Sequence, residues 1–341
     1  MIPWAATGIG SMPGTNADEQ SRIVAGELPD WPHVVELPAR GPGSDMVGRT
    51  LGQISKVAQD FAVATTPSGW RLADGRGREM RRSASWLAED CDAAERHYAG
   101  VGNIKISLCG PWTLAAAVEM RNGERAIRDH GFCQDVVAAL RATSIELIAD
   151  LQRRLPATTI WLQFDEPSLP AVLAARIKTA SGMATYRAVD APRVAESLQS
   201  LTAAVKQSQA MSMIHGCASD SPLDLFRRSN FDALSVDVST SSGVSHDAMS
   251  AVLDEGRGLV LGLPNELGSS AKAKRVTELL GEFGFAGDEV AQRVGLSPTC
   301  GLANQTDTAV RQILGTLRIT GSHLRDDDPA LSESGQEDRA R

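Results

Sequence analysis

The sequence predicts an α/β fold, a (β/α)8 TIM barrel, and three observations support this prediction. Eight short hydrophobic runs follow one another along the chain, and several of them are almost uninterrupted by polar residues. Segments with helical periodicity, such as 136–155 and 192–209, lie between the runs. Uninterrupted runs are typical of strands buried on both faces of a parallel sheet, and eight strands alternating with helices form a barrel. The length of 341 residues also suits one such barrel, which needs roughly 250.

Each expected strand is followed by turn residues, which mark where the strand ends. The second and third runs are separated by about 65 residues, more than a simple connection needs. The glycine-rich stretch at 69–80 in this connection predicts a hairpin, or an excursion over the barrel mouth of the kind that forms lids. We therefore expect a catalytic barrel over 1–324 with a long insertion after strand 2. The expected strands are 5–10, 34–38, 104–111, 159–167, 210–217, 233–239, 258–264 and 294–300.

The last segment, 325–341, is polar and acidic and has no periodicity. A segment of this composition cannot bury enough hydrophobic surface to offset the entropy of ordering it. We expect a disordered acidic tail.

Composition and charge exclude several classes of protein. Hydrophobic residues make up 42% and charged residues 22%, close to globular averages. The net charge is −8 and no dense Lys/Arg stripe occurs, so nucleic acid is not an expected partner. The N-terminus lacks the features of a signal peptide and no hydrophobic stretch is long enough to span a membrane, which predicts a cytoplasmic protein without membrane contact. The sequence does not predict an oligomeric state.

Three potential metal ligands stand at the ends of expected strands: His215, Cys217 and Cys300. A barrel brings distant strand ends to one face, where three protein ligands and an open position make a catalytic zinc site. Two thiolates and an imidazole suit zinc better than magnesium or calcium, and a sulfur-rich sphere favours binding a further thiol. The alternative is that these cysteines are small buried hydrophobic residues and that His-x-Cys is a chance match. Packing is what we expect of the other cysteines, Cys91, Cys109 and Cys133.

Two further strand ends carry groups that could bind a substrate. The first run ends in Gly8-Ile9-Gly10-Ser11, a tight turn whose N–H groups could hold a carboxylate. Pro13 stands where a dinucleotide fingerprint needs glycine, which excludes a Rossmann site. The fourth run ends in Asp165-Glu166-Pro167, where adjacent carboxylates point to opposite sides of an extended chain. One of them could bind a substrate ammonium, and the alternative is a structural helix cap.

Taken in order, these strand ends resemble the catalytic C-terminal domain of the cobalamin-independent methionine synthase family, in its short core type. The resemblance runs from about residue 5 to residue 320, and its strength lies in the order of six landmarks. The landmarks are Gly8-Ile9-Gly10-Ser11, Asp45-Met46-Val47, Gly110-Pro111 with Thr113, Asp165-Glu166-Pro167, His215-x-Cys217 and Pro298-x-Cys300-Gly301-Leu302.

The resemblance implies a zinc-dependent methyltransferase that converts homocysteine to methionine, with methyltetrahydrofolate or a methylated corrinoid as donor. His215, Cys217 and Cys300 would hold the zinc, and the family's fourth ligand, a glutamate, falls on Asp237. The Ile9-Gly10-Ser11 turn would bind the homocysteine carboxylate. Asp165, the candidate catalytic residue, would pair with its ammonium beside Glu166.

Two departures from the family pattern leave alternatives open. The family glutamate upstream of Asp-Met-Val falls near Arg40, and the family histidine after the seventh strand falls near Pro264. The protein could therefore be a zinc alkyltransferase for another small thiol, or a non-catalytic barrel that binds zinc or substrate. A metal-free relative resembling uroporphyrinogen decarboxylase would not require the three ligands together.

Overall fold

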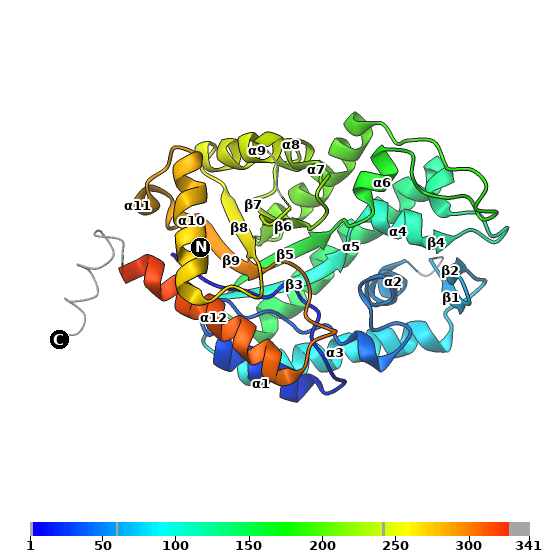
Figure 1. The fold of residues 1–341 in the computed structure, drawn as a ribbon. Coiled ribbons are helices and arrows are strands. Elements are labelled where there is room, and N and C mark those ends of the chain that lie inside the picture. The colour runs from blue at the N-terminus through cyan, green and yellow to red at the C-terminus, as the bar shows by residue number, and fades with distance from the viewer. Residues whose placement is uncertain (1–2, 59–60, 241–242, 327–341) are drawn as a thin grey trace.

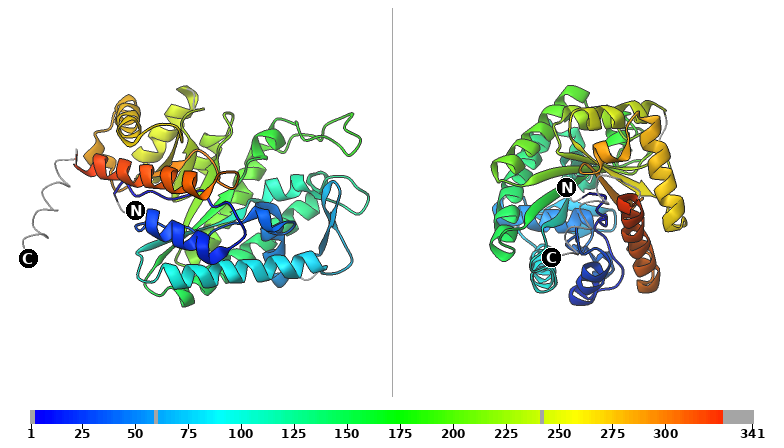
Figure 2. Two further views of the ribbon diagram at one scale, coloured as in Figure 1. Left: turned by 60° about the horizontal axis from the view of Figure 1, so that its bottom comes forward. Right: turned by 90° about the vertical axis from the view of Figure 1, so that its left-hand side faces the viewer.

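The computed structural model describes residues 3–58, 61–240 and 243–326. Its centre is a six-stranded sheet in which all neighbouring strands run parallel. The sheet curls, and helices surround its outer side (Figures 1 and 2). The predicted α/β class is therefore confirmed. The strands, in their order in the sheet, are β3 (Asn103–Cys109), β5 (Thr159–Asp165), β6 (Met211–Gly216), β7 (Ala233–Asp237), β8 (Gly258–Leu263) and β9 (Val294–Pro298).

The first two predicted strands, 5–10 and 34–38, form only isolated bridges. Ala6 bridges to Leu296 of β9, Ser11 bridges to Glu36, and His33 bridges to Lys105 of β3, all in parallel. The ladder does not extend at Gly8, where a Cβ atom would lie 2.2 Å from the ring of His33. The backbone there packs against an imidazole rather than a strand. The prediction of eight strands is thus confirmed for six of them.

The helices follow the strands as the hydrophobic pattern predicts, and the two periodic segments fall on α5 and α7. Side-chain caps fix the starts of several helices: Asn16 accepts from the first turn of α1, Asp45 from that of α2 and Asp129 from that of α5. The helices are α1 (Ala17–Glu27), α2 (Met46–Val57), α3 (Arg78–His97), α4 (Pro111–Ala117), α5 (His130–Arg154), α6 (Leu169–Leu173), α7 (Ala191–Gln207), α8 (Leu223–Arg228), α9 (Gly243–Asp254), α10 (Ser269–Glu282), α11 (Gly287–Val290) and α12 (Asp307–Asp326), with short 3-10 turns η1 (Pro38–Arg40) and η2 (Ala126–Arg128).

The long connection before β3 contains α2, a β-hairpin and α3. The hairpin strands β1 (Val63–Thr66) and β2 (Gly69–Leu72) are antiparallel, and β2 also pairs with the short β4 (Val118–Glu119). The hairpin turns at 67–68, the first residues of the glycine-rich stretch 69–80 form its second strand, β2, and the last residues of the stretch begin α3. The three strands lie at the edge of the molecule, beside α2 and away from the main sheet (Figure 1).

The end of the described chain is helical. Arg325 and Asp326, the first residues of the predicted tail, complete α12, and Arg325 donates a hydrogen bond to the carbonyl of Pro3 at 2.9 Å. Residues 327–341 lie outside the described residues. Within the described ranges, no helix is long and hydrophobic enough to cross a membrane.

Candidate functional site

A cavity of about 300 Å³ lies at the carboxyl ends of β5 and β6. It brings together residues that are far apart in the sequence, as the ends of parallel strands do. Of the predicted site residues, Ile9, Gly10, Ser11, Asp165, His215, Cys217 and Cys300 line it, and Glu166 and Asp237 do not. Its other lining residues are Glu36, Met46, Ser107, Pro167, Gly301, Ala303 and Asn304.

Cys217 and Cys300 form a hydrogen-bonded pair of sulfurs in this cavity. Cys217 follows β6 and Cys300 follows β9. The neighbouring side chains of Cys217 and His215 lower the pKa of Cys300 to about 4. The pKa of Cys217 is raised, first by its hydrogen bond to Cys300 and then by burial. The thiolate form is therefore favoured at Cys300 and disfavoured at Cys217.

His215 presents a nitrogen without a partner beside these sulfurs. The residue is 5% exposed, at the end of β6. Its Nδ1 lies 3.1 Å from the hydroxyl of Ser235, whereas its buried Nε2 has no hydrogen-bond partner. With the proton on Nδ1, the ring donates to Ser235 and leaves the lone pair of Nε2 free to bind a metal.

These three side chains fit a zinc ion by their chemistry. A thiolate, a thiol that can lose its proton and a free imidazole nitrogen are the donors that zinc prefers. Among the described residues, no group of three or more His, Cys, Asp or Glu side chains is preassembled around a metal position.

The turn at Ile9-Gly10-Ser11 offers unpaired backbone N–H groups to the same cavity. Its three carbonyls accept hydrogen bonds from Lys105 Nζ, Glu36 N and Leu302 N, respectively. None of its three N–H groups has an acceptor in the described part of the chain. Successive free N–H groups of this kind bind anions. The turn can approach Cys300 closely because Gly301 has no side chain; a Cβ there would lie 2.0 Å from Ser11 Oγ.

Two carboxyl groups, Asp165 and Glu36, complete the polar wall of the cavity. Asp165 accepts a hydrogen bond from Gln163 at 2.7 Å, and burial raises its pKa. Burial also raises the pKa of Glu36 to about 8, although the guanidinium of Arg49 at 3.9 Å opposes that shift. Burial thus disfavours the charged form of both groups, and a cationic ligand group would favour it.

The sequence comparison missed Glu36. Spacing from the Asp-Met-Val landmark pointed to Arg40, but Arg40 lies outside the cavity lining and donates to Asp90 at 2.8 Å and to the carbonyl of Thr15 at 2.9 Å. Glu36 is the one charged residue within the second hydrophobic run, Val-Val-Glu-Leu-Pro (34–38), so a search along that run would have found it. Pro264 is also absent from the lining.

Glu166 points away from the cavity and caps α4. Its carboxylate accepts hydrogen bonds from the N–H groups of Trp112 (2.9 Å) and Thr113 (2.8 Å) and from the Thr113 hydroxyl (2.6 Å). Burial raises the pKa of Glu166 to about 7, against the effect of these donors. Gly110 makes the contact feasible, since a Cβ there would lie 2.4 Å from the carboxyl carbon. The Gly-Pro and Asp-Glu-Pro landmarks thus form one structural unit.

Asp237 ends β7 and forms a local turn. Its carboxylate accepts hydrogen bonds from the N–H (2.9 Å) and hydroxyl (2.6 Å) of Ser239. Both hydrogen bonds use the same carboxylate oxygen, and the residue is not part of the cavity lining.

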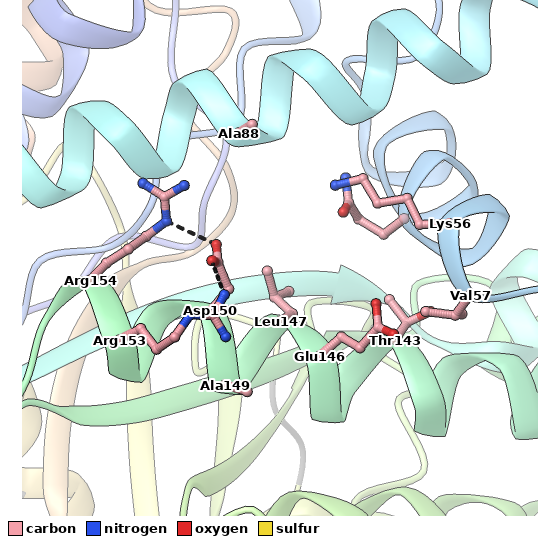
Figure 3. A pocket seen from close by; sticks show the side chains of 11 residues that line it. Lys56, Val57, Ala88, Thr143, Glu146, Leu147, Ala149, Asp150, Arg153 and Arg154 are labelled. Carbon is pink, nitrogen blue, oxygen red and sulfur yellow. Dashed lines mark hydrogen bonds and ion pairs between the residues drawn. The ribbon is translucent and has the colours of Figure 1, made fainter.

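A larger cavity, of about 440 Å³, lies on the outside of the molecule between α2, α3 and α5 (Figure 3). Asp150 there is engaged by Arg153 and Arg154, and Lys56 lies at the other end of the cavity (Figure 3). Its lining contains no His or Cys. The strand-end cavity is therefore the better candidate for chemistry.

Comparisons with solved structures give only distant likenesses. The chain is similar to a thermostable xylanase mutant from Cellvibrio japonicus, with 10% identity over 93% of this chain and 97% of that chain and a TM-score of 0.42. It is also similar to a morphinone reductase variant in complex with tetrahydroNAD, with 11% identity over 86% and 82% of the two chains and a TM-score of 0.39. Both scores are too low to bear on function. Comparison with curated proteins finds no match.

A family model gives the decisive comparison. The model described as the cobalamin-independent synthase catalytic domain matches residues 4–321. This range includes every residue that lines the strand-end cavity. The chain therefore belongs to the family of cobalamin-independent synthase catalytic domains.

Proposed function

We propose that this protein is a methyltransferase that transfers a methyl group to the thiol of homocysteine and so forms methionine. One observation supports the proposal most directly. A single cavity is lined both by donors suited to zinc and by the polar groups that a thiol amino acid needs. Membership of a synthase family agrees with an enzyme of this type.

In this proposal His215, Cys217 and Cys300 hold a zinc ion. Asp237 is a candidate fourth ligand that would first have to leave its turn with Ser239. When bound, the ion would act as a Lewis acid that lowers the pKa of the acceptor thiol and keeps its sulfur nucleophilic near neutral pH.

The other wall of the cavity would bind the amino-acid end of homocysteine. The free N–H groups of Ile9, Gly10 and Ser11 donate to the carboxylate. Asp165 and Glu36 accept hydrogen bonds from the ammonium, which favours their charged forms and offsets the effect of burial. Selectivity for an amino acid over a simple thiol follows from these contacts.

The methyl donor has to reach the acceptor sulfur from the open side of the cavity. Displacement at a methyl carbon gains mainly from orientation, so donor and sulfur must be held in line. Methyltetrahydrofolate and a methylated corrinoid are both suitable donors.

The test is to incubate the metal-loaded protein with homocysteine and either methyltetrahydrofolate or methylcobalamin, and to measure methionine and bound metal on the same sample. Methionine formation with one donor supports the proposal and identifies that donor. Asp165→Asn should weaken homocysteine binding by roughly ten- to 150-fold, the effect of one lost charge-assisted hydrogen bond, and should leave the metal in place. If this variant binds homocysteine as the wild type does, or if mercaptoethanol binds the wild type equally well, a zinc alkyltransferase for another small thiol replaces this proposal.

A further inference from the structure

Lys105 is a buried cation that the functions considered so far do not use. It lies in β3 with 1% of its surface exposed. Its Nζ donates to the carbonyl of Ile9 at 2.7 Å and to Oε1 of Gln163 at 2.6 Å. Burying an ammonium is costly unless hydrogen bonds compensate, so these two contacts account for its position. Lys105 does not line the cavity, and any effect on a substrate has to pass through its partners.

Lys105 determines which way the amide of Gln163 points. An ammonium only donates hydrogen bonds, so the amide oxygen must face Lys105 and the NH2 group must face the other way. That NH2 group donates to the carbonyl of Ile9 at 3.1 Å and to Oδ1 of Asp165 at 2.7 Å. Gln163 is fully buried, so water cannot replace these partners. The orientation of one amide therefore fixes Asp165.

The same contacts fix the turn that offers N–H groups to the cavity. Two donors, Lys105 and Gln163, hold the carbonyl of Ile9. In a planar trans peptide the N–H group points opposite to the carbonyl, so the N–H of Gly10 points away from these donors. Gly10 lines the cavity and the two donors do not, which puts that N–H on the cavity side.

The charged groups closest to Lys105 include the two carboxyl groups of the strand-end cavity. Asp165 on β5 and Glu36 before η1 favour its charged form, and Arg49 on α2 opposes it. Burial is the largest influence and lowers the pKa of Lys105 to about 7. Burial lowers the pKa of the nearby His33 ring well below its ordinary value, and the charges of Lys105 and Arg49 lower it further. A charged Lys105 thus depends on the two carboxylates that a ligand ammonium would also contact.

We propose that Lys105 is a positioning residue for the acceptor: through Ile9 and Gln163 it orients the two groups that grip the ends of an amino acid, the N–H turn and the Asp165 carboxylate. This inference rests on the proposed function. It predicts that Lys105 controls the preference for an amino acid over a simple thiol and does not control the affinity for the thiol itself.

The experiment compares Lys105→Met with the wild type by calorimetric titration of the zinc-loaded protein with homocysteine and, separately, with mercaptoethanol. Mercaptoethanol has the thiol but neither the carboxylate nor the ammonium. We expect Lys105→Met to weaken homocysteine binding roughly tenfold or more, and mercaptoethanol affinity and zinc content to stay within about twofold. A general structural defect would instead weaken both ligands together.

Lys272→Met is the matched control, because Lys272 is fully buried, lies on α10, donates to the carbonyl of Leu267 and is not part of the cavity. It should keep the preference for homocysteine.

If Lys105→Met does not fold, Lys105→Met/Gln163→Leu replaces both partners with hydrophobic groups and should also lose the preference. A wild type without any preference would overturn the proposed function, and this inference with it. A preference that persists in the Lys105 variants would overturn the role of Lys105 alone.

Discussion

Cys217 follows β6 and Asp237 ends β7 of the same sheet, but their side chains have different neighbours. The Cys217 thiol contacts Cys300 inside the cavity, whereas the Asp237 carboxylate is engaged by Ser239. The sequence could not distinguish them, because both occupy positions where the family has a ligand. Side-chain direction after a strand depends on the turn that follows, and Ser239 supplies a local partner that spacing does not reveal.

This difference predicts unequal effects on metal retention. Cys217→Ala should lose most of the bound zinc, because it removes a sulfur that faces the cavity. Asp237→Ala should lose much less, because its carboxylate has to leave a turn before it can bind. Metal analysis of both proteins after the same dialysis checks this, with Cys133→Ala, a buried cysteine outside the cavity, as the control. Equal and complete loss in both variants would show that Asp237 is a full ligand.

Glu36 gives a pH-dependent contribution to stability. Its folded pKa of about 8 lies above its ordinary value of 4.5, so between these values the folded state keeps a proton that the unfolded state has released. This contribution is complete below pH 4.5 and is lost as the pH rises toward 8. Glu36→Gln does not titrate, so its unfolding free energy relative to wild type should increase by on the order of 1–3 kcal/mol from pH 5 to pH 8.

Urea unfolding of the metal-free proteins at the two pH values measures this difference. A constant difference between Glu36→Gln and wild type would mean that Glu36 is already ionised in the folded state at neutral pH. Glu146→Gln, an exposed change on α5, should show no such trend.

At the level of elements, α4 depends on a carboxylate from another part of the chain. This short helix begins with Pro111, and its next two N–H groups donate to Glu166, which follows β5. The unpaired donors at a helix start must be satisfied when they are buried. The sequence suggested a cap at Asp165-Glu166, but it could not show that the helix being capped starts more than 50 residues earlier.

Glu166→Gln should therefore destabilise the protein, because an amide replaces one acceptor oxygen with a donor that faces other donors. We expect a loss of about 1–3 kcal/mol in unfolding free energy at pH 8, measured by urea unfolding. The exposed Glu146→Gln is again the matched control and should stay within about 0.5 kcal/mol. If Glu166→Gln proved as stable as wild type, the cap would not hold α4.

For the molecule as a whole, hydrophobic runs correctly predicted the six strands of the sheet but not the two segments at its edges, which form only isolated bridges. Runs such as Ile104–Leu108 and Leu259–Leu263 are buried on both faces and form strands where expected. The run at 5–10 was also expected to be a strand, but Gly8 lies against the ring of His33, a contact between segments that no local pattern encodes. Most of the candidate site was predictable because its residues stand at the ends of strands. Glu36 was missed because the spacing from Asp-Met-Val, which includes the intervening loop, pointed to Arg40 instead.

The two walls of the cavity differ in how extensively their backbone is paired, because isolated bridges replace strand pairing at the edges of the sheet. Residues 103–109 of β3 pair along their whole length with β5, and β5 pairs in turn with β6, which carries His215. In the described part of the chain, the segments that carry Gly10 and Glu36 pair with the backbone of this sheet only through bridges at Ala6 and His33, to which the side chains of Lys105 and Gln163 add hydrogen bonds at Ile9. Local opening in native proteins starts where few backbone hydrogen bonds hold a segment. We therefore expect the part of the cavity that would bind the amino acid to open locally at a lower free energy than the part that would hold the metal. An acceptor bound there would contact both weakly paired segments and so stabilise them in the closed position.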